Sequence, residues 1–145
     1  MGRISRRVLD RQVEEQVFET LWEAVSEVKG RTNVQAFLND LLTPVERVMV
    51  AKRLAIAVLL LKKMAYGEIV DLLKVSNETI ARIALIIKNS QGFNIAIDKV
   101  IRSEAGREIW REIENLIYRF SSPGKVFLPE EVVKYKQGRR KRTIV

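Results

Sequence analysis

The sequence of 145 residues contains no cysteine and no histidine. The absence of cysteine excludes disulfides and thiolate metal sites. Without either residue type, the chain also lacks the commonest general base, nucleophile and metal ligands, so catalysis is the weakest hypothesis. Glu108 and Glu112 place two carboxylates on one helix face, but nothing beside them supplies the remaining ligands of a metal site. We therefore expect a protein that is not an enzyme and has no catalytic residue, metal ion or cofactor.

Long apolar runs are also absent. The longest candidate covers residues 54–61, whereas a membrane helix needs about 18 consecutive apolar residues. The first residues, MGRISRRVLDRQ, lack the apolar segment of a secretion signal. From these two absences we expect no membrane insertion and a cytoplasmic location.

The net charge of +8 comes entirely from the two ends of the chain. Residues 1–11 contribute +3 and residues 125–145 contribute +5, which leaves the middle neutral. Basic arms on a neutral core are typical of polyanion binders, because each neutralised phosphate releases counterions. Two other uses stay open, since such arms also keep a protein in solution or contact anionic lipid. The cations that we assign to phosphate contacts are Arg3, Arg6, Arg7, Arg139, Arg140, Lys141 and Arg142.

Apolar residues recur at helical spacing along most of the chain, and no useful stretch alternates as a β-strand does. In the first half we expect helices over residues 13–28, over residues 34–41 and from Pro44 onward. Gly30 suits the C-cap of the first helix. Thr43 and Glu46 form a capping box that opens the third. Because residues 54–61 are apolar nearly all round, this third helix should be the central buried one, covered partly by a second subunit.

Two helices are expected toward the C-terminus. Asn94 is a suitable N-cap for a short helix over residues 95–101, and Ser103 for a longer one. The expected buried stripe of the longer helix, flanked by Trp110, consists of Ile109, Ile113, Leu116, Ile117 and Phe120. Residues 121–124 should end this helix, and residues 130–136 should add a last turn or two.

The most informative stretch covers residues 66–87. Residues 66–73 predict a short helix, residues 74–76 a sharp turn, and Ser76 the N-cap of a second helix. Apolar side chains on one face of that helix leave the polar residues of its first turn on the other face. Two short helices joined by a three-residue turn form a helix-turn-helix, whose second helix enters the major groove. Any two consecutive helices of an all-α core would share this spacing, so that alternative stays open.

Two blocks of residues resemble the Trp repressor superfamily. The first is Leu41-Leu42-Thr43-Pro44-x-Glu46-Arg47, followed by Arg53 and Leu60-Leu61; the second is Met64, Glu68, Ile69, Leu73, Thr79, Ile80 and Arg82. The segment NSQGFNIAIDKVI at residues 89–101 looks more like a sister branch of Trp-repressor-like proteins whose ligand is unassigned. The resemblance implies an all-α, intertwined homodimer on double-stranded DNA. The chain would then divide into a basic arm (1–11), a DNA-binding domain (12–101), an additional helix (102–122) and a basic tail (123–145).

The resemblance also implies which residues face DNA, and these are Tyr66, Gly67, Val70, Asn77, Glu78, Thr79 and Ala81. Asn77 could pair with an adenine edge and Glu78 could accept from a cytosine amino group, while Thr79 and Ala81 could pack on a thymine methyl. A misplaced Glu78 would instead repel phosphate. Val70 could simply pack inward.

The family's ligand-binding positions correspond to Thr43, Arg53 and Arg82. Arginines could clamp a carboxylate or stack on a ring, but Ile83 and Ile86 replace the small polar residues that would complete a tryptophan site. We therefore expect no response to tryptophan. The structural alternative is that Thr43 only caps a helix and the arginines pair with acids such as Glu46. A family turn glycine is also replaced, by Lys74, which would be strained if its φ is positive.

The leading functional hypothesis is a sequence-specific, dimeric transcriptional regulator that binds DNA. Phosphate contacts would position the protein and residues 77–81 would specify the sequence. One alternative is a non-catalytic interaction module in which the helix that starts after Ser103 docks a protein partner. Another is RNA binding through the arms. Whether a small-molecule effector exists is left open.

Overall fold

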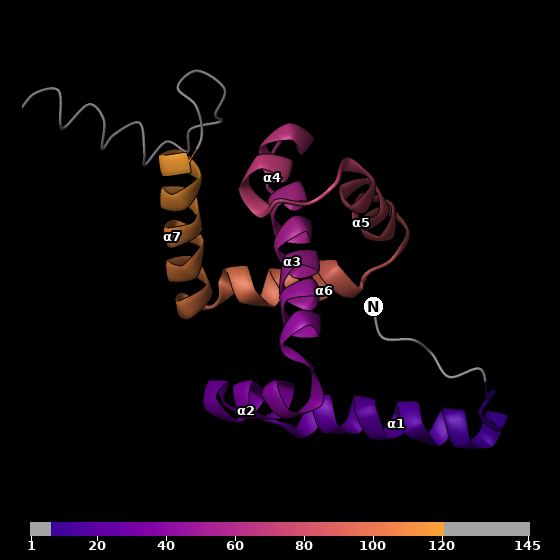
Figure 1. The fold of residues 1–145 in the computed structure, drawn as a ribbon. Coiled ribbons are helices and arrows are strands. Elements are labelled where there is room, and N and C mark those ends of the chain that lie inside the picture. The colour runs from indigo at the N-terminus through magenta and orange to yellow at the C-terminus, as the bar shows by residue number, and fades with distance from the viewer. Residues whose placement is uncertain (1–6, 121–145) are drawn as a thin grey trace, which may run out of the picture. The chain divides into compact units, whose positions relative to one another are not determined.

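The computed structural model describes residues 7–120, except for the side chain of Phe120, and these residues form seven helices without a strand (Figure 1). The helices are α1 (Arg11–Glu27), α2 (Arg31–Leu41), α3 (Pro44–Leu61), α4 (Tyr66–Leu73), α5 (Asn77–Asn89), α6 (Gly92–Arg102) and α7 (Glu104–Phe120). The all-α prediction is confirmed. The predicted break at residues 121–124 and the predicted turn at residues 130–136 lie outside the described residues. The chain falls into two compact units, divided between Ala51 and Lys52.

The first unit contains α1, α2 and the start of α3. Asp10 caps α1, because its carboxylate accepts from the backbone N–H of Gln12 at 3.0 Å. Gly30 was predicted to close α1, and this is wrong. The helix ends at Glu27 followed by an extended Val28, while Gly30 has a φ of 88° and stands at the N-cap of α2. The positive φ is therefore needed to begin α2, which starts at Arg31.

The capping box at the start of α3 is confirmed. The Glu46 carboxylate accepts from the backbone N–H of Thr43 at 2.8 Å, and the Thr43 hydroxyl accepts from the N–H of Glu46 at 3.3 Å. The hydrogen bond from the Thr43 backbone, helped by its hydroxyl, lowers the pKa of Glu46 below its ordinary value of 4.5. Arg47 ties α3 to α2 by donating to the carbonyl of Asn39 at 3.2 Å.

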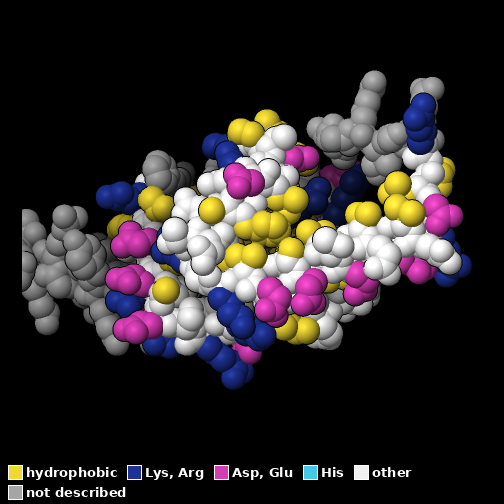
Figure 2. Space-filling view, turned by 90° about the horizontal axis from the view of Figure 1, so that it is seen from below, with side chains coloured by type: hydrophobic (Ala, Val, Ile, Leu, Met, Phe, Trp, Pro, Cys, Tyr) yellow, Lys and Arg dark blue, Asp and Glu magenta, His cyan; other side chains and the backbone are white. Residues whose placement is uncertain are grey.

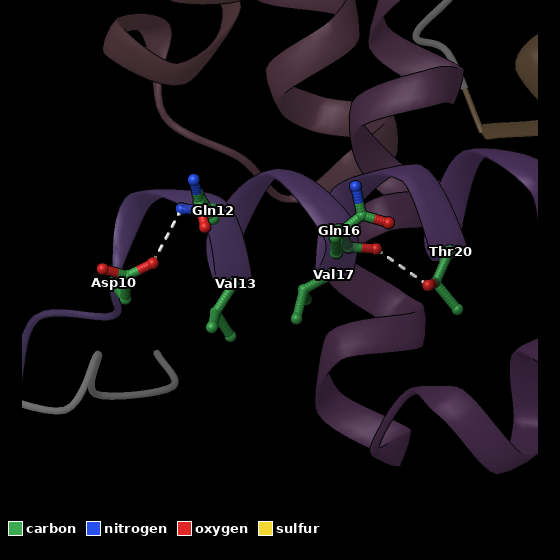
Figure 3. Close-up of a pocket in the computed structure, with 6 residues that line it drawn as sticks. All are labelled: Asp10, Gln12, Val13, Gln16, Val17 and Thr20. Carbon is green, nitrogen blue, oxygen red and sulfur yellow. Dashed lines mark hydrogen bonds between the residues drawn. The ribbon is translucent and has the colours of Figure 1, made fainter.

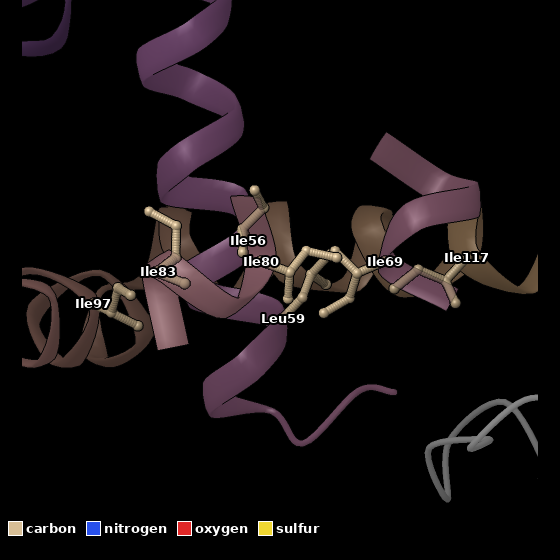
Figure 4. Packing of buried hydrophobic residues seen from close by; sticks show 8 residues of the cluster. Ile56, Leu59, Ile69, Ile80, Ile83, Ile97 and Ile117 are labelled. Atoms are coloured by element: carbon tan, nitrogen blue, oxygen red, sulfur yellow. The ribbon is translucent and has the colours of Figure 1, made fainter. Parts of the chain in front are cut away.

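The second unit contains the core. Its buried side chains come from five helices, and they are Ile56, Ala57 and Leu59 of α3, Ile69 of α4, Ile80 and Ile83 of α5, Ile97 of α6 and Ile117 of α7 (Figure 4). The prediction that α3 is central is therefore confirmed for its second half. This half of α3 is not buried on every side within the chain, because Leu54 remains 43% exposed.

The link from α5 to α6 differs from the prediction. Asn94 was expected to cap α6, but α6 begins at Gly92 and Asn94 lies inside it. The Asn94 amide instead reaches the carbonyls of Ile87 and Ser90, each at 3.4 Å, so it joins the start of α6 to the end of α5. A side chain that can cap a helix can equally bridge two helices when the turn between them is short.

The buried line of α7 also needs correction. Ser103 caps the helix as predicted, since its hydroxyl accepts from the N–H of Gly106 at 3.0 Å. Ile117 is buried and Ile113 is half-buried, but Ile109 and Leu116 are exposed. The inward face consists of Gly106, Trp110, Ile113 and Ile117, at a spacing of four, three and four residues. The apolar stripe of α7 is thus wider than the face that its own chain covers.

Candidate nucleic-acid interface

The turn between α4 and α5 is held by local hydrogen bonds. Lys74 has φ 54° and ψ 53°, the left-handed conformation, and its N–H donates to the carbonyl of Val70 at 2.9 Å. Ser76 then caps α5, because its hydroxyl accepts from the N–H of Thr79 at 3.2 Å. The two hydroxyls of Ser76 and Thr79 lie 2.9 Å apart and share a hydrogen bond. These local hydrogen bonds therefore hold α5 in a defined direction relative to α4.

The two faces of α5 are chemically different. Ile80 and Ile83 are buried in the same cluster as Ile69 of α4, so the two helices of the motif share one core. The opposite face of the first turns presents Asn77, Glu78 and Ala81 to solvent. This arrangement is what a recognition helix requires, since its N-terminal side chains must reach base edges while its back packs on the domain.

The seven predicted DNA-facing residues do not all have the same exposure. Tyr66 and Gly67, at the start of α4, are exposed like the three residues of α5. Val70 is half-buried and packs against the core, as the inward alternative for this residue anticipated. Thr79 is half-buried too, and its hydroxyl is engaged by Ser76. Of the predicted DNA-facing residues on α5, the exposed polar side chains are therefore Asn77 and Glu78.

Glu78 forms an ion pair along the surface of α5. Its carboxylate accepts from the guanidinium of Arg82 at 2.6 Å, with the two side chains 74% and 72% exposed. An exposed pair of this kind adds little stability, but it places a positive charge beside the Glu78 carboxylate. Arg82 was expected to bind a ligand or to pair with an acid such as Glu46. The structure pairs it with Glu78.

The other two candidate ligand residues are Thr43 and Arg53. Thr43 lies in the first unit, where both its backbone N–H and its hydroxyl are used in the capping box of α3. Arg53 is exposed on α3 in the second unit. Ile83, which replaces a small polar residue of the tryptophan site, is buried in the core, whereas Ile86 is 44% exposed. Among the described residues, no group of acidic side chains is placed to hold a metal ion.

Of the cations predicted to contact phosphate, the described part of the chain contains Arg7, which is exposed. Arg3, Arg6, Arg139, Arg140, Lys141 and Arg142 lie outside the described residues. Two further cations, which are not among the predicted phosphate contacts, stand at the ends of α4. Lys63 has a φ of 62° just before this helix, and Lys74 follows it directly. Both are exposed, and both lie in turns between helices.

The geometry defines the class of the protein: an all-α chain with a helix-turn-helix whose second helix exposes its first turn. Residues 16–101 match the family model described as Trp repressor protein. The chain belongs to that family. No curated protein and no solved structure was found to match the chain. Within the described residues, no helix has the length and hydropathy to cross a membrane.

Proposed function

We propose that the protein is a sequence-specific, DNA-binding transcriptional regulator that acts as a homodimer. The observation that supports this most directly is the exposed first turn of α5, which is fixed by the Ser76 cap and by burial of Ile80 behind it. Membership of a family of repressors supports a regulatory DNA-binding role rather than an enzymatic one.

Base recognition would fall mainly to the first two residues of α5. The Asn77 amide can both donate to and accept from an adenine edge, and Glu78 can accept from the amino group of cytosine. The methyl group of Ala81, one turn further along, suits contact with a thymine methyl. Lys63 and Lys74 stand at either end of α4, where cations would contact phosphate and set the orientation on DNA. The basic arms at the two ends of the chain would add further phosphate contacts.

The proposal of a homodimer rests on the uncovered apolar surface of α1. Neither α1 nor α2 contains a buried residue, although large apolar side chains follow one face of α1. These are Val13, Val17, Phe18, Trp22 and Val25. Figure 3 shows Val13 and Val17 projecting from the same face, beside a shallow hollow that is also lined by Asp10, Gln16 and Thr20.

A surface of this kind is typical of a subunit interface. Phe18 and Trp22 stack with ring centroids 5.8 Å apart, and Trp22 is 56% exposed. Figure 2 likewise shows apolar side chains open to solvent among acidic ones on the face that it draws. Large apolar side chains exposed side by side along one helix face are typical of an interaction site in a folded protein. A second copy would cover it and would also supply the second recognition helix that a two-fold DNA site requires.

The dimer is tested by solution mass. The wild-type protein should sediment at about twice the chain mass of 16.7 kDa. Trp22→Lys places a charge in the proposed interface and should dissociate the dimer, whereas Glu23→Lys reverses a charge at the next, exposed position and should not. A monomeric wild type, or equal effects of the two substitutions, would contradict the proposal.

DNA recognition is tested with duplexes selected from a random pool by the wild-type protein. Replacing Asn77 by Ala should reduce the preference for the selected duplex over a scrambled one by about 5- to 100-fold, as expected when one bidentate bond to a base is removed. Asn89→Ala is the matched control, because Asn89 is exposed at the far end of the same helix. If Asn77→Ala keeps the full preference, or if no sequence is enriched, the specific recognition proposed here is wrong.

The protein-interaction alternative is favoured by one observation, the exposure of Ile109 and Leu116 on α7. Two apolar residues one heptad apart suit a helix that docks against another helix. Ile109→Lys together with Leu116→Lys should leave DNA recognition unchanged if the regulator proposal is right. A wild-type protein that enriches no DNA sequence would instead favour the interaction alternative, in which the helix-turn-helix serves only as a scaffold.

A further inference from the structure

Helix α7 contributes to the core that carries the helix-turn-helix, although it lies beyond the segment that matches the family. The match ends at residue 101, and α7 begins at Glu104. Ile117 of α7 is nevertheless only 5% exposed and belongs to the same buried cluster as Ile69 of α4, which is 0% exposed. Figure 4 shows Ile117 at the Ile69 end of this cluster, with Ile97 of α6 at the opposite end.

A second contact joins α7 to the turn that leads into α4. The ammonium group of Lys62 lies over the Trp110 ring, 4.9 Å from the ring centroid, in a cation–π arrangement. The indole N–H of Trp110 donates to Glu114 on the next turn of α7, which fixes the orientation of the ring. Lys62 follows the last residue of α3 and comes shortly before Tyr66, the first residue of α4.

The base of α7 is fixed against α6 by a close backbone approach at a glycine. A Cβ atom added to Gly106 would lie 1.8 Å from the carbonyl oxygen of Val100. The junction thus permits only glycine at this position without a backbone shift. Gly106 therefore allows the start of α7 to pack closely against the end of α6.

Helix α4 is the shortest helix of the core and needs support from its neighbours. It has eight residues, well below the length of about 12 to 15 at which an isolated helix becomes marginally stable. Ile69 is its one buried residue. Contacts made by neighbouring helices must therefore hold α4 in place, and α5 follows α4 through a turn of three residues.

We propose that α7 is a positioning helix for DNA recognition, in which Ile117 and Trp110 hold α4 and thereby set the position of the first turn of α5. The expected effect on DNA binding rests on the proposed function, whereas the packing of α7 against the core does not depend on DNA. Removing this packing should loosen α4 and α5 before it unfolds the rest of the second unit, because local stability follows local packing.

The test compares two identical substitutions at opposite ends of one core. Ile117→Val and Ile97→Val each remove one methylene from an almost fully buried side chain, so the two substitutions should lower global stability by similar amounts. Native-state hydrogen exchange of the α4 amides should become about three- to tenfold faster in Ile117→Val than in Ile97→Val. Equal exchange of α4 in both variants would show that α7 only adds to general stability, and the proposal would be overturned.

The Trp110 contact is tested by rescue. Trp110→Leu removes the aromatic face under Lys62, whereas Trp110→Phe keeps it. Exchange of the α4 amides should be faster in the Leu variant and should return toward the wild-type rate in the Phe variant. If Leu and Phe give the same rate, the cation–π contact does not position α4.

The consequence for function is measured with the selected duplex at a temperature at which all variants are folded. Ile117→Ala should bind it at least about fivefold more weakly than Ile97→Ala, since the recognition turn is ordered in a smaller fraction of molecules. If the wild type fails to bind DNA specifically, the proposed function fails, while the exchange comparison still decides whether α7 holds α4. If exchange differs but binding does not, α7 stabilises α4 without positioning it for DNA, which would also overturn the proposal.

Discussion

Lys74 allows the clearest quantitative prediction, because its backbone conformation and its charge have opposite consequences. The residue adopts φ 54° and ψ 53° in the turn of the helix-turn-helix. In this left-handed region a side chain costs about 1 to 2 kcal/mol, because its Cβ approaches the following carbonyl oxygen. Glycine has no such cost but loses about 0.4 to 1 kcal/mol more backbone entropy on folding. Lys74→Gly should therefore stabilise the protein by about 0.5 to 1 kcal/mol net.

The charge of Lys74 predicts the opposite effect on DNA binding. The side chain is exposed close to Asn77 in the chain, and a cation there would neutralise a phosphate. Its removal should lower the slope of log K against log salt by about 0.9 for each phosphate that Lys74 neutralises. Lys74→Ala separates the two effects, since it removes the same charge but keeps a Cβ in the left-handed conformation. The two variants should thus share the weaker binding and differ in stability.

Thermal unfolding and salt-dependent binding together test this reasoning. Lys74→Gly should raise the melting temperature by about 3 °C, given the usual entropy of unfolding for a domain of this size. Lys99→Gly is the matched control, because Lys99 is exposed within α6, where glycine costs about 0.5 to 1 kcal/mol. The strain argument is refuted if Lys74→Gly lowers the melting temperature as Lys99→Gly does. An unchanged salt slope in both Lys74 variants would remove Lys74 from the phosphate contacts.

Three further predictions concern the helix ends. Thr43→Ala should destabilise the protein by about 1 kcal/mol in thermal unfolding, because the cap of α3 is lost. Thr43→Ser keeps the hydroxyl and should retain most of the wild-type stability. Equal stabilities of the Ala and Ser variants would show that the hydroxyl bond to Glu46 does not contribute. Hydrogen bonds from Thr43 lower the pKa of Glu46 in the folded protein. The ionised Glu46 carboxylate should therefore stabilise the fold fully above pH 4.5, and this stabilisation should be lost as the pH falls through the folded-state pKa. The stability difference between wild type and Glu46→Gln should therefore shrink on acidification, and a constant difference would contradict the assignment. Gly106→Ala should cost about 1 to 3 kcal/mol because its Cβ meets the Val100 carbonyl, whereas Gly92→Ala, with open space around its Cβ, should be neutral or slightly stabilising.

Local signals in the sequence predicted the helix starts well. Ser76, Thr43 and Ser103 were all identified as caps, and each accepts the backbone hydrogen bond expected of it. Such bonds join residues three positions apart, so the residues that decide them are close together in the sequence. The replaced turn glycine was also located correctly, because Lys74 does adopt a positive φ.

Predictions failed where a residue had two local uses. Gly30 suits both the end of one helix and the beginning of the next, and Asn94 suits both a cap and a bridge between helices. Which use Gly30 or Asn94 takes depends on where the neighbouring helix begins. The start of that helix depends on packing across the turn and not on the residue itself. The contact between Trp110 and Lys62 was not predicted for a related reason, since it joins two segments that are distant in the sequence.

The apolar periodicity of a helix predicts how wide its covered face must be, but it does not say which chain covers it. On α5 the covered residues Ile80 and Ile83 meet partners from the same chain. On α1 the stripe is equally regular, yet its large side chains remain exposed in a single chain. Leaving several large apolar side chains in water costs about 25 cal/mol for each Å² of apolar surface, and the proposed homodimer would remove this cost by covering the stripe of α1. Ile109 and Leu116 of α7 are also exposed, but these two residues form too small a surface to require a partner.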